Sequence, residues 1–120
     1  MKLIERLDYL NKLINVMETP DIKVITGVRR SGKSKLLEAF KAYILKNYSA
    51  INIIHINFNL PEFDDLLEYR KLYDYVNSKY VEEFKNFVFI DEVQMCENFE
   101  KAINGLHALE KYDIYLTGSN

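Results

Sequence analysis

The stretch that decides the fold reads Ile22-Lys23-Val24-Ile25-Thr26-Gly27-Val28-Arg29-Arg30-Ser31-Gly32-Lys33-Ser34. Its first five residues are rich in β-branched side chains and are followed by a glycine, which predicts a short buried strand. The next eight residues match the pattern G-x-x-x-x-G-K-[ST] in full. Leucine, phenylalanine and isoleucine then recur at helical spacing, which predicts a helix over residues 33–47. A glycine loop between a strand and a helix is the context that a phosphate-binding loop requires.

This loop suits phosphate for reasons of backbone geometry and charge. Glycines let the backbone turn its N–H groups inward around phosphate oxygens. The helix that follows directs unpaired N–H groups and a partial positive charge at the same anion. Lys33 would carry a charge to the β and γ phosphates, and the Ser34 hydroxyl would ligate Mg²⁺. The expected nucleotide-binding set is Gly27, Arg30, Ser31, Gly32, Lys33, Ser34 and Lys35.

A second motif lies about sixty residues further on, at Phe87-Val88-Phe89-Ile90-Asp91-Glu92. Four apolar residues predict a buried strand, and two carboxylates emerge at its carboxyl end, where ligands of open parallel sheets bind. Asp91 would join the Mg²⁺ shell directly or through water, and Glu92 would orient the attacking water. Acidic residues at a strand end are often merely solvated, but the preceding phosphate loop favours a catalytic role.

Strands and helices alternate along the rest of the chain. Apolar spacing predicts an amphipathic helix at 2–17, a strand at 51–58, a helix at about 64–84, a helix around Phe99, Ile103 and Leu106, and a strand at 112–117. This order predicts parallel strands joined by right-handed crossovers, with helices packed on both faces of the sheet. The fold class is therefore α/β, a three-layer α/β/α sandwich of the P-loop NTPase type.

Composition and charge bear on the number of domains, the class of partner and the cellular location. The 120 residues suit one domain, and the net charge of −2 gives no global argument for nucleic acid or an anionic membrane. The first half is basic and the second acidic, which suits either a shared anionic ligand or two solvated faces. The single cysteine, Cys96, excludes an intrachain disulfide. No run approaches the ~20 apolar residues of a membrane helix, and the N-terminus is unlike a secretory signal, so we expect a cytoplasmic protein.

The motifs resemble those of AAA-type ATPases from archaea and bacteria. That family carries G-x-R-R-x-G-K-S, then D-E-V-Q, then a strand ending in T-G-S, and the matching segments here are residues 27–34, 91–94 and 117–119. The helix at 2–17 is similar to the family's lead-in helix. The resemblance covers essentially the whole chain. It implies a Walker A motif at 27–34, a Walker B motif at 87–92 and a sensor-1 strand at 112–120, with Ser119 or Asn120 as the sensor residue.

The resemblance implies Mg²⁺-dependent hydrolysis of ATP. It also implies that hydrolysis is coupled to action on a target, an unassigned protein or nucleic acid. Many AAA-type proteins assemble so that one subunit completes another's site, so a homo-oligomer is an expectation for the full-length protein. The chain is shorter than the family pattern, which continues with a fifth strand, a helical lid, sensor 2 and an arginine finger. We therefore expect an N-terminal fragment, weak or inactive by itself, whose strand at 22–26 forms an exposed edge.

The sequence is also compatible with two other functions. One is an ATP-binding switch or interaction module with little hydrolysis, and the other is a P-loop kinase, for which the sequence supplies no acceptor-binding lid. Among the remaining polar residues, His55 is interpreted as a packed or edge histidine rather than a metal ligand, because no second His or Cys shares a metal-site spacing. His107 is expected to be solvated and Cys96 inert. Gln94 matches the family motif without an assigned role.

Overall fold

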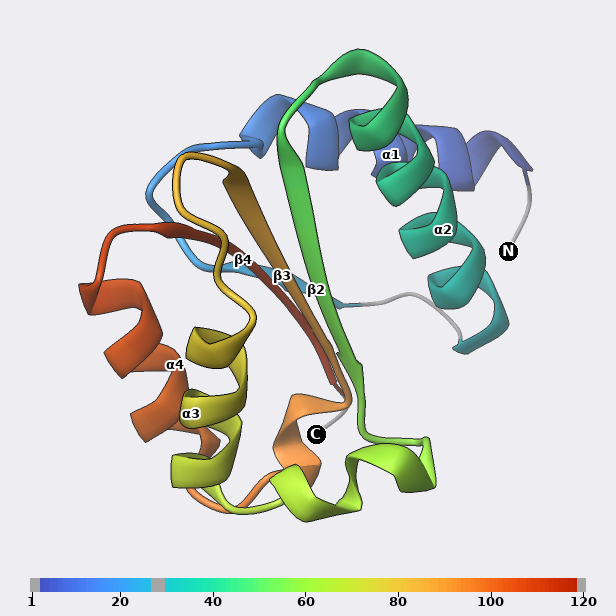
Figure 1. The fold of residues 1–120 in the computed structure, drawn as a ribbon. Coiled ribbons are helices and arrows are strands. Elements are labelled where there is room, and N and C mark those ends of the chain that lie inside the picture. The colour runs from blue at the N-terminus through green and yellow to red at the C-terminus, as the bar shows by residue number, and fades with distance from the viewer. Residues whose placement is uncertain (1–2, 27–29, 119–120) are drawn as a thin grey trace.

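A four-stranded parallel sheet forms the middle layer of the protein (Figure 1). The computed structural model of the 120-residue chain describes residues 3–26 and 30–118, and the side chains of residues 8–26 and 32–118. The strands are β1 (Lys23–Ile25), β2 (Ile51–Asn57), β3 (Lys85–Asp91) and β4 (Tyr112–Thr117), in the order β1-β4-β3-β2. All three pairings are parallel. The predicted α/β fold is therefore confirmed.

Helices cover both faces of this sheet (Figure 1). The helices α1 (Leu3–Val16) and α2 (Arg30–Asn47) pack on one face, and α3 (Tyr69–Ser78) and α4 (Phe99–Ala108) pack on the other. Two 3-10 helices, η1 (Pro61–Leu66) and η2 (Val93–Met95), follow β2 and β3. The element order matches the predicted alternation.

The side-chain alternation of β3 decides which residues face which layer. Phe87 and Phe89 belong to the core under α1 and α2, whereas Val88 and Ile90 belong to the core under α3 and α4. Successive side chains of a strand point to opposite faces, so Asp91 lies on the α1/α2 side. The Asp91 carboxylate therefore lies on the side of the sheet where α2 begins.

The predicted helix over residues 64–84 is wrong in extent. α3 begins only at Tyr69, because the Glu68 side chain caps it by accepting hydrogen bonds from the backbone N–H groups of Arg70 and Lys71. It ends at Ser78. The connection to β3 is held in a non-helical conformation by Asn86, whose side-chain amide bonds to both the N–H and the C=O of Val81. Capping side chains thus override the helical apolar spacing at both ends.

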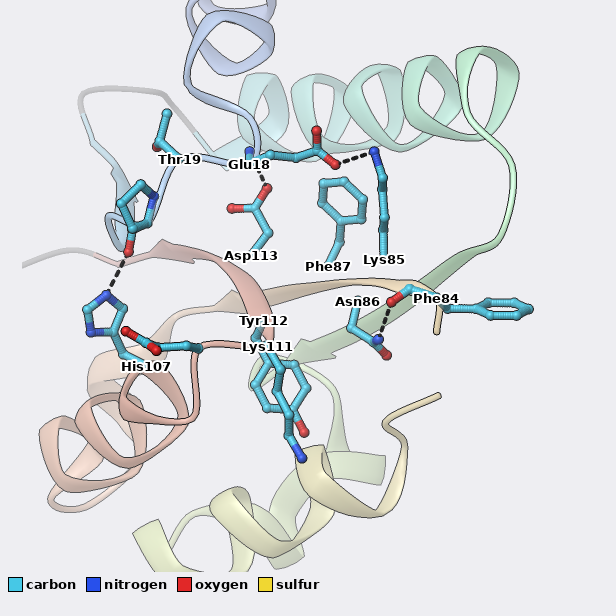
Figure 2. A pocket seen from close by; sticks show the side chains of 12 residues that line it. Glu18, Thr19, Phe84, Lys85, Asn86, Phe87, His107, Lys111, Tyr112 and Asp113 are labelled. Carbon is cyan, nitrogen blue, oxygen red and sulfur yellow. Dashed lines mark hydrogen bonds and ion pairs between the residues drawn. The ribbon is translucent and has the colours of Figure 1, made fainter. Parts of the chain in front are cut away.

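The amino end of the sheet is fastened by a buried ion pair. Lys23 Nζ lies 2.6 Å from Asp113 Oδ1, and the two side chains are 7% and 10% exposed. The other Asp113 oxygen accepts hydrogen bonds from the Tyr115 hydroxyl and from the backbone N–H of Glu18, as Figure 2 shows for Glu18. The connection between α1 and β1 is therefore tied to the start of β4.

The placement of β1 agrees with the expectation taken from the resemblance. β1 pairs with β4, and it is the last strand on that side among the described strands. Val24, in its middle, is 61% exposed.

In the part of the chain that the structure describes, no helix is long and apolar enough to cross a membrane.

Candidate nucleotide site

The candidate site lies at the carboxyl end of the sheet, where α2 begins (Figure 1). Lys33 stands in the first turn of α2, and Asp91 ends β3. Asp91 is in register with Asn57 of β2, and its neighbour Ile90 is in register with Leu116 of β4. Because the strands are parallel, their carboxyl ends meet at one edge and can share one ligand.

Lys33 is buried between two carboxylates. Its Nζ lies 2.5 Å from Glu92 Oε1 and 3.8 Å from Asp91 Oδ1, and its side chain is only 10% exposed. A buried ammonium group is tolerated when anions of this kind compensate the loss of water. Three predicted site residues from two distant segments are therefore in contact.

Both oxygens of Asp91 accept hydrogen bonds from the protein. The Thr117 hydroxyl donates to Oδ1 at 2.9 Å, and His55 Nε2 lies 2.8 Å from Oδ2. Burial by itself raises the pKa of Asp91, but the hydrogen bonds from His55 and Thr117, together with nearby positive charge, outweigh it, so this pKa lies below the usual value. Asp91 is thus held in its ionised form.

Glu92 has an uncommon backbone conformation for a residue with a side chain. Its φ and ψ of 57° and 49° lie in the left-handed region. The backbone N–H of Glu92 donates to the Thr117 hydroxyl oxygen at 3.2 Å. Thr117 therefore joins Asp91 and Glu92, and it directs the chain so that the two carboxylates meet Lys33.

Gln94 now has a structural role that the sequence did not reveal. Its Nε2 donates to Glu92 Oε2 at 2.7 Å. Gly118 lies beside the Gln94 amide, and a methyl group on Gly118 would overlap the Gln94 side-chain oxygen. Gln94 of the D-E-V-Q segment and Gly118 of the T-G-S segment are therefore adjacent in space, because β3 and β4 are paired.

His55 also has contacts that the sequence did not predict. Its ring packs on Phe89, with centroids 5.9 Å apart, as the packed-histidine interpretation expected. Its Nε2 faces Asp91, and its Nδ1 lies 2.9 Å from Lys41 Nζ. The alternation of side chains along β2 was the sequence signal for these contacts. It places His55 on the opposite side of β2 from the core residues Ile54 and Ile56.

The other predicted nucleotide-binding residues that the structure describes lie in the first two turns of α2. Ser34 and Lys35 are exposed and line an open hollow of about 450 Å³ together with Glu38 and Ala39. Gly32 is buried. Gly27, Ser119 and Asn120 lie outside the described residues, as do the side chains of Arg30 and Ser31.

The donor chemistry of the site fits magnesium. Asp91 supplies hard carboxylate oxygens, each of which has further acceptor capacity beyond its one hydrogen bond, and Ser34 offers a hydroxyl. Among the described residues, no group of three or more His, Cys, Asp or Glu is arranged to hold a metal. Magnesium in triphosphate sites uses one or two carboxylates plus phosphate oxygens and water, so it does not need such a cage.

A separate cavity of about 460 Å³ lies at the opposite, amino end of the strands (Figure 2). Its wall includes Lys85 and Asp113, from the starts of β3 and β4, and the Glu18–Lys85 ion pair spans part of it at 2.6 Å. His107 of α4 lies there with its Nε2 2.6 Å from the Pro20 carbonyl oxygen. None of the predicted site residues that the structure describes lines this cavity.

Cys96 is buried away from the candidate site chemistry. Burial and the nearby carboxylate of Glu68 raise its pKa to about 11. A thiol of that kind is a poor nucleophile, which agrees with the expectation of an inert cysteine.

Comparison with known proteins assigns the fold to a family. Residues 19–120 match the family model described as an AAA domain. An uncharacterised protein of Haemophilus influenzae is 36% identical over 120 residues, covering 98% of this chain and 30% of its own length. An uncharacterised protein of Methanocaldococcus jannaschii is 29% identical over 126 residues, covering all of this chain and 26% of its own. The chain thus spans less than a third of either relative.

Proposed function

Because this chain belongs to the AAA domain family, which indicates an ATPase-like nucleotide-binding function, we propose that it binds ATP and hydrolyses it with magnesium. One observation carries the proposal. Lys33 Nζ lies 2.5 Å from Glu92 and 3.8 Å from Asp91, at the carboxyl end of a parallel sheet and in the first turn of a helix. This arrangement combines a phosphate-binding cation with a metal-binding carboxylate and a base.

ATP binding in this proposal replaces one partner of Lys33 by another. The phosphates would approach the N-terminal turn of α2, where backbone N–H groups point outward. Lys33 would exchange the Glu92 carboxylate for β- and γ-phosphate oxygens. The exchange keeps the buried ammonium group paired throughout, so its cost is small compared with stripping a charge of all partners.

The exchange would release the Glu92 carboxylate, which could then take part in hydrolysis. Glu92 would orient a water molecule toward the γ-phosphorus and accept its proton, yielding ADP and inorganic phosphate. Lys33 would stabilise the negative charge on the transferring phosphoryl group. Ser34 and Asp91 would hold magnesium, which when bound neutralises charge on the β and γ phosphates.

A second function, an ATP-dependent switch with little turnover, is favoured by a specific contact. Glu92 Oε2 accepts a hydrogen bond from Gln94, while Oε1 pairs with Lys33. A carboxylate engaged in this way does not polarise water. If nucleotide binding left both contacts in place, the protein would bind ATP without hydrolysing it.

The target and assembly of the protein are also proposals. The full-length protein would couple ATP turnover to a change of shape that acts on a protein or nucleic acid, as a homo-oligomer in which neighbouring subunits complete each site. The relatives are three to four times longer than this chain.

Paired binding and turnover measurements on the full-length protein test the proposal. Calorimetry should show that Lys33→Ala abolishes ATP binding, and that Glu92→Gln retains binding while phosphate release falls by about a hundredfold or more. Lys46→Ala, which removes an exposed lysine from the last turn of α2, serves as the control.

Normal hydrolysis by Glu92→Gln would contradict the assigned mechanism. Binding without phosphate release in the unchanged protein would favour the switch, and transfer of phosphate to an acceptor would indicate a kinase.

A further inference from the structure

His55 connects the metal-binding carboxylate to the helix that follows the phosphate loop. Its Nε2 lies 2.8 Å from Asp91 Oδ2, and its Nδ1 lies 2.9 Å from Lys41 Nζ. Lys41 belongs to α2, two turns after Lys33, and also pairs with Glu38 at 3.1 Å. Both links are largely shielded, since the side chains of His55 and Lys41 are 23% and 20% exposed.

These two contacts determine which ring nitrogen carries a proton. A lysine ammonium group has three donors and no acceptor. His55 Nδ1 must therefore be unprotonated and accept from Lys41, so Nε2 carries the hydrogen and donates it to Asp91. The helix thus selects the tautomer in which the imidazole is a donor to the carboxylate.

The result is a carboxylate fixed from two strands. Thr117 of β4 donates to Oδ1, and His55 of β2 donates to Oδ2. With one hydrogen bond on each oxygen, rotation about the Cβ–Cγ bond of Asp91 would break both. The remaining lone pairs keep a fixed direction, which is what a ligand of an octahedral magnesium ion requires.

We propose that His55 is a positioning residue, which holds the Asp91 carboxylate in the orientation that binds the magnesium–ATP complex, through a tautomer that Lys41 selects. The inference rests on the proposed role of Asp91 in magnesium binding. It extends the site to two residues outside every motif of the sequence. It also gives α2 two functions, phosphate binding at its first turn and control of the carboxylate two turns further along.

Three variants separate this role from simple packing. His55→Gln places an amide N–H near the position of Nε2, so it keeps the donor without a tautomer. His55→Phe keeps an aromatic ring against Phe89 but removes the donor. Lys41→Met removes the group that selects the tautomer. Lys46→Met removes an exposed charge from the same helix and is the matched control.

The measurement is the affinity for ATP with and without magnesium, by calorimetry on the full-length protein. His55→Phe should weaken binding in the presence of magnesium by about ten- to a hundredfold, the usual effect of losing a hydrogen bond to a metal ligand. Binding without magnesium should not change. His55→Gln should stay within about threefold of the unchanged protein, because a donor remains. Lys41→Met should weaken binding in the unchanged background but not in the His55→Gln background.

Nitrogen NMR of the imidazole supplies a readout that needs no nucleotide. The folded protein should show His55 with its hydrogen on Nε2, and Lys41→Met should mix the tautomers. A spectrum with the hydrogen on Nδ1 would overturn the inference. If Asp91→Asn weakens magnesium-dependent binding but His55→Phe does not, only the positioning role fails. If Asp91→Asn also has no effect, the metal assignment in the proposed function fails, and the inference fails with it.

Discussion

Gly118 lies so close to Gln94 that a methyl group on Gly118 would overlap the Gln94 side-chain oxygen. The same Gln94 amide donates to Glu92 at 2.7 Å. A glycine at the end of β4 thus leaves room for a contact made by the proposed catalytic glutamate.

Gly118→Ala should therefore displace Gln94 from Glu92 without unfolding the protein, because the end of a flexible side chain can move aside. We expect about a three- to tenfold change in phosphate release, with ATP affinity and thermal stability nearly unchanged, since an exposed hydrogen bond to a charged group contributes roughly 1 kcal/mol. Gln94→Ala should reproduce the effect, and the double variant should add nothing to it. Additive effects would show that Gly118 acts independently of Gln94.

Replacing Glu92 should strengthen nucleotide binding while it stops turnover. In the structure Glu92 pairs with Lys33, so at the proposed site it would compete with phosphate for the ammonium group, and Glu92→Gln would remove this competitor. We expect ATP to bind about fivefold more tightly, which corresponds to roughly 1 kcal/mol, because Lys33 keeps Asp91 as a second partner. Calorimetry beside Glu82→Gln, an exposed glutamate before β3, checks the effect. Weaker binding by Glu92→Gln would mean that Glu92 contacts the nucleotide complex favourably.

The lowered pKa of Asp91 predicts how stability depends on pH. A carboxyl group whose pKa is lower in the folded than in the unfolded protein adds stability above its unfolded pKa, about 4, and loses it as pH falls through the folded pKa. Asp91→Asn should cost roughly 1–3 kcal/mol at pH 7, and this difference should shrink below about pH 4. Urea unfolding between pH 3 and 7 measures it. Asp65→Asn, an exposed site in η1, should leave the profile unchanged.

The buried ion pair at the amino end of the sheet should be sensitive to removal of one partner. Asp113→Ala leaves Lys23 in the interior without its carboxylate; the Thr19 carbonyl oxygen at 2.6 Å and the Tyr115 ring, whose centroid is 5.4 Å from Nζ, remain beside it. Breaking a buried pair in this way costs about 3–5 kcal/mol of unfolding free energy. Denaturant unfolding measures the loss, with exposed Asp21→Ala as control. Adding Lys23→Met should recover part of it, and no recovery would argue against the uncompensated charge as the cause.

Sequence patterns predicted the sheet and singled out residues that meet at its carboxyl end, because both depend on local signals. The loop before Lys33 and the carboxylates after Ile90 each sit at a strand end, and parallel strand ends converge. The β3–β4 register placed Thr117 beside Asp91, and no local pattern contains that pairing.

The features that the sequence missed depend on contacts between distant segments. The helix predicted over 64–84 had the right apolar spacing, but Glu68 and Asn86 hold the chain in caps that the spacing does not reveal. His55 was interpreted alone, as a packed or edge histidine. Its role depends on Lys41, fourteen residues earlier, and on Asp91, thirty-six residues later, so it emerges only when α2, β2 and β3 are assembled.

The two ends of β4 make this strand a mechanical connection across the protein. Asp113 at its start is bound to the segment that leads from α1 to β1, and Thr117, four residues later, is bound to Asp91 and Glu92. A strand extends about 3.3 Å per residue and resists stretching, so these anchor points stay roughly 13 Å apart. If Thr117 shifts when Glu92 leaves Lys33, β4 would carry the displacement to the end of α1. A displacement at the proposed nucleotide site would thereby reach the opposite end of the sheet.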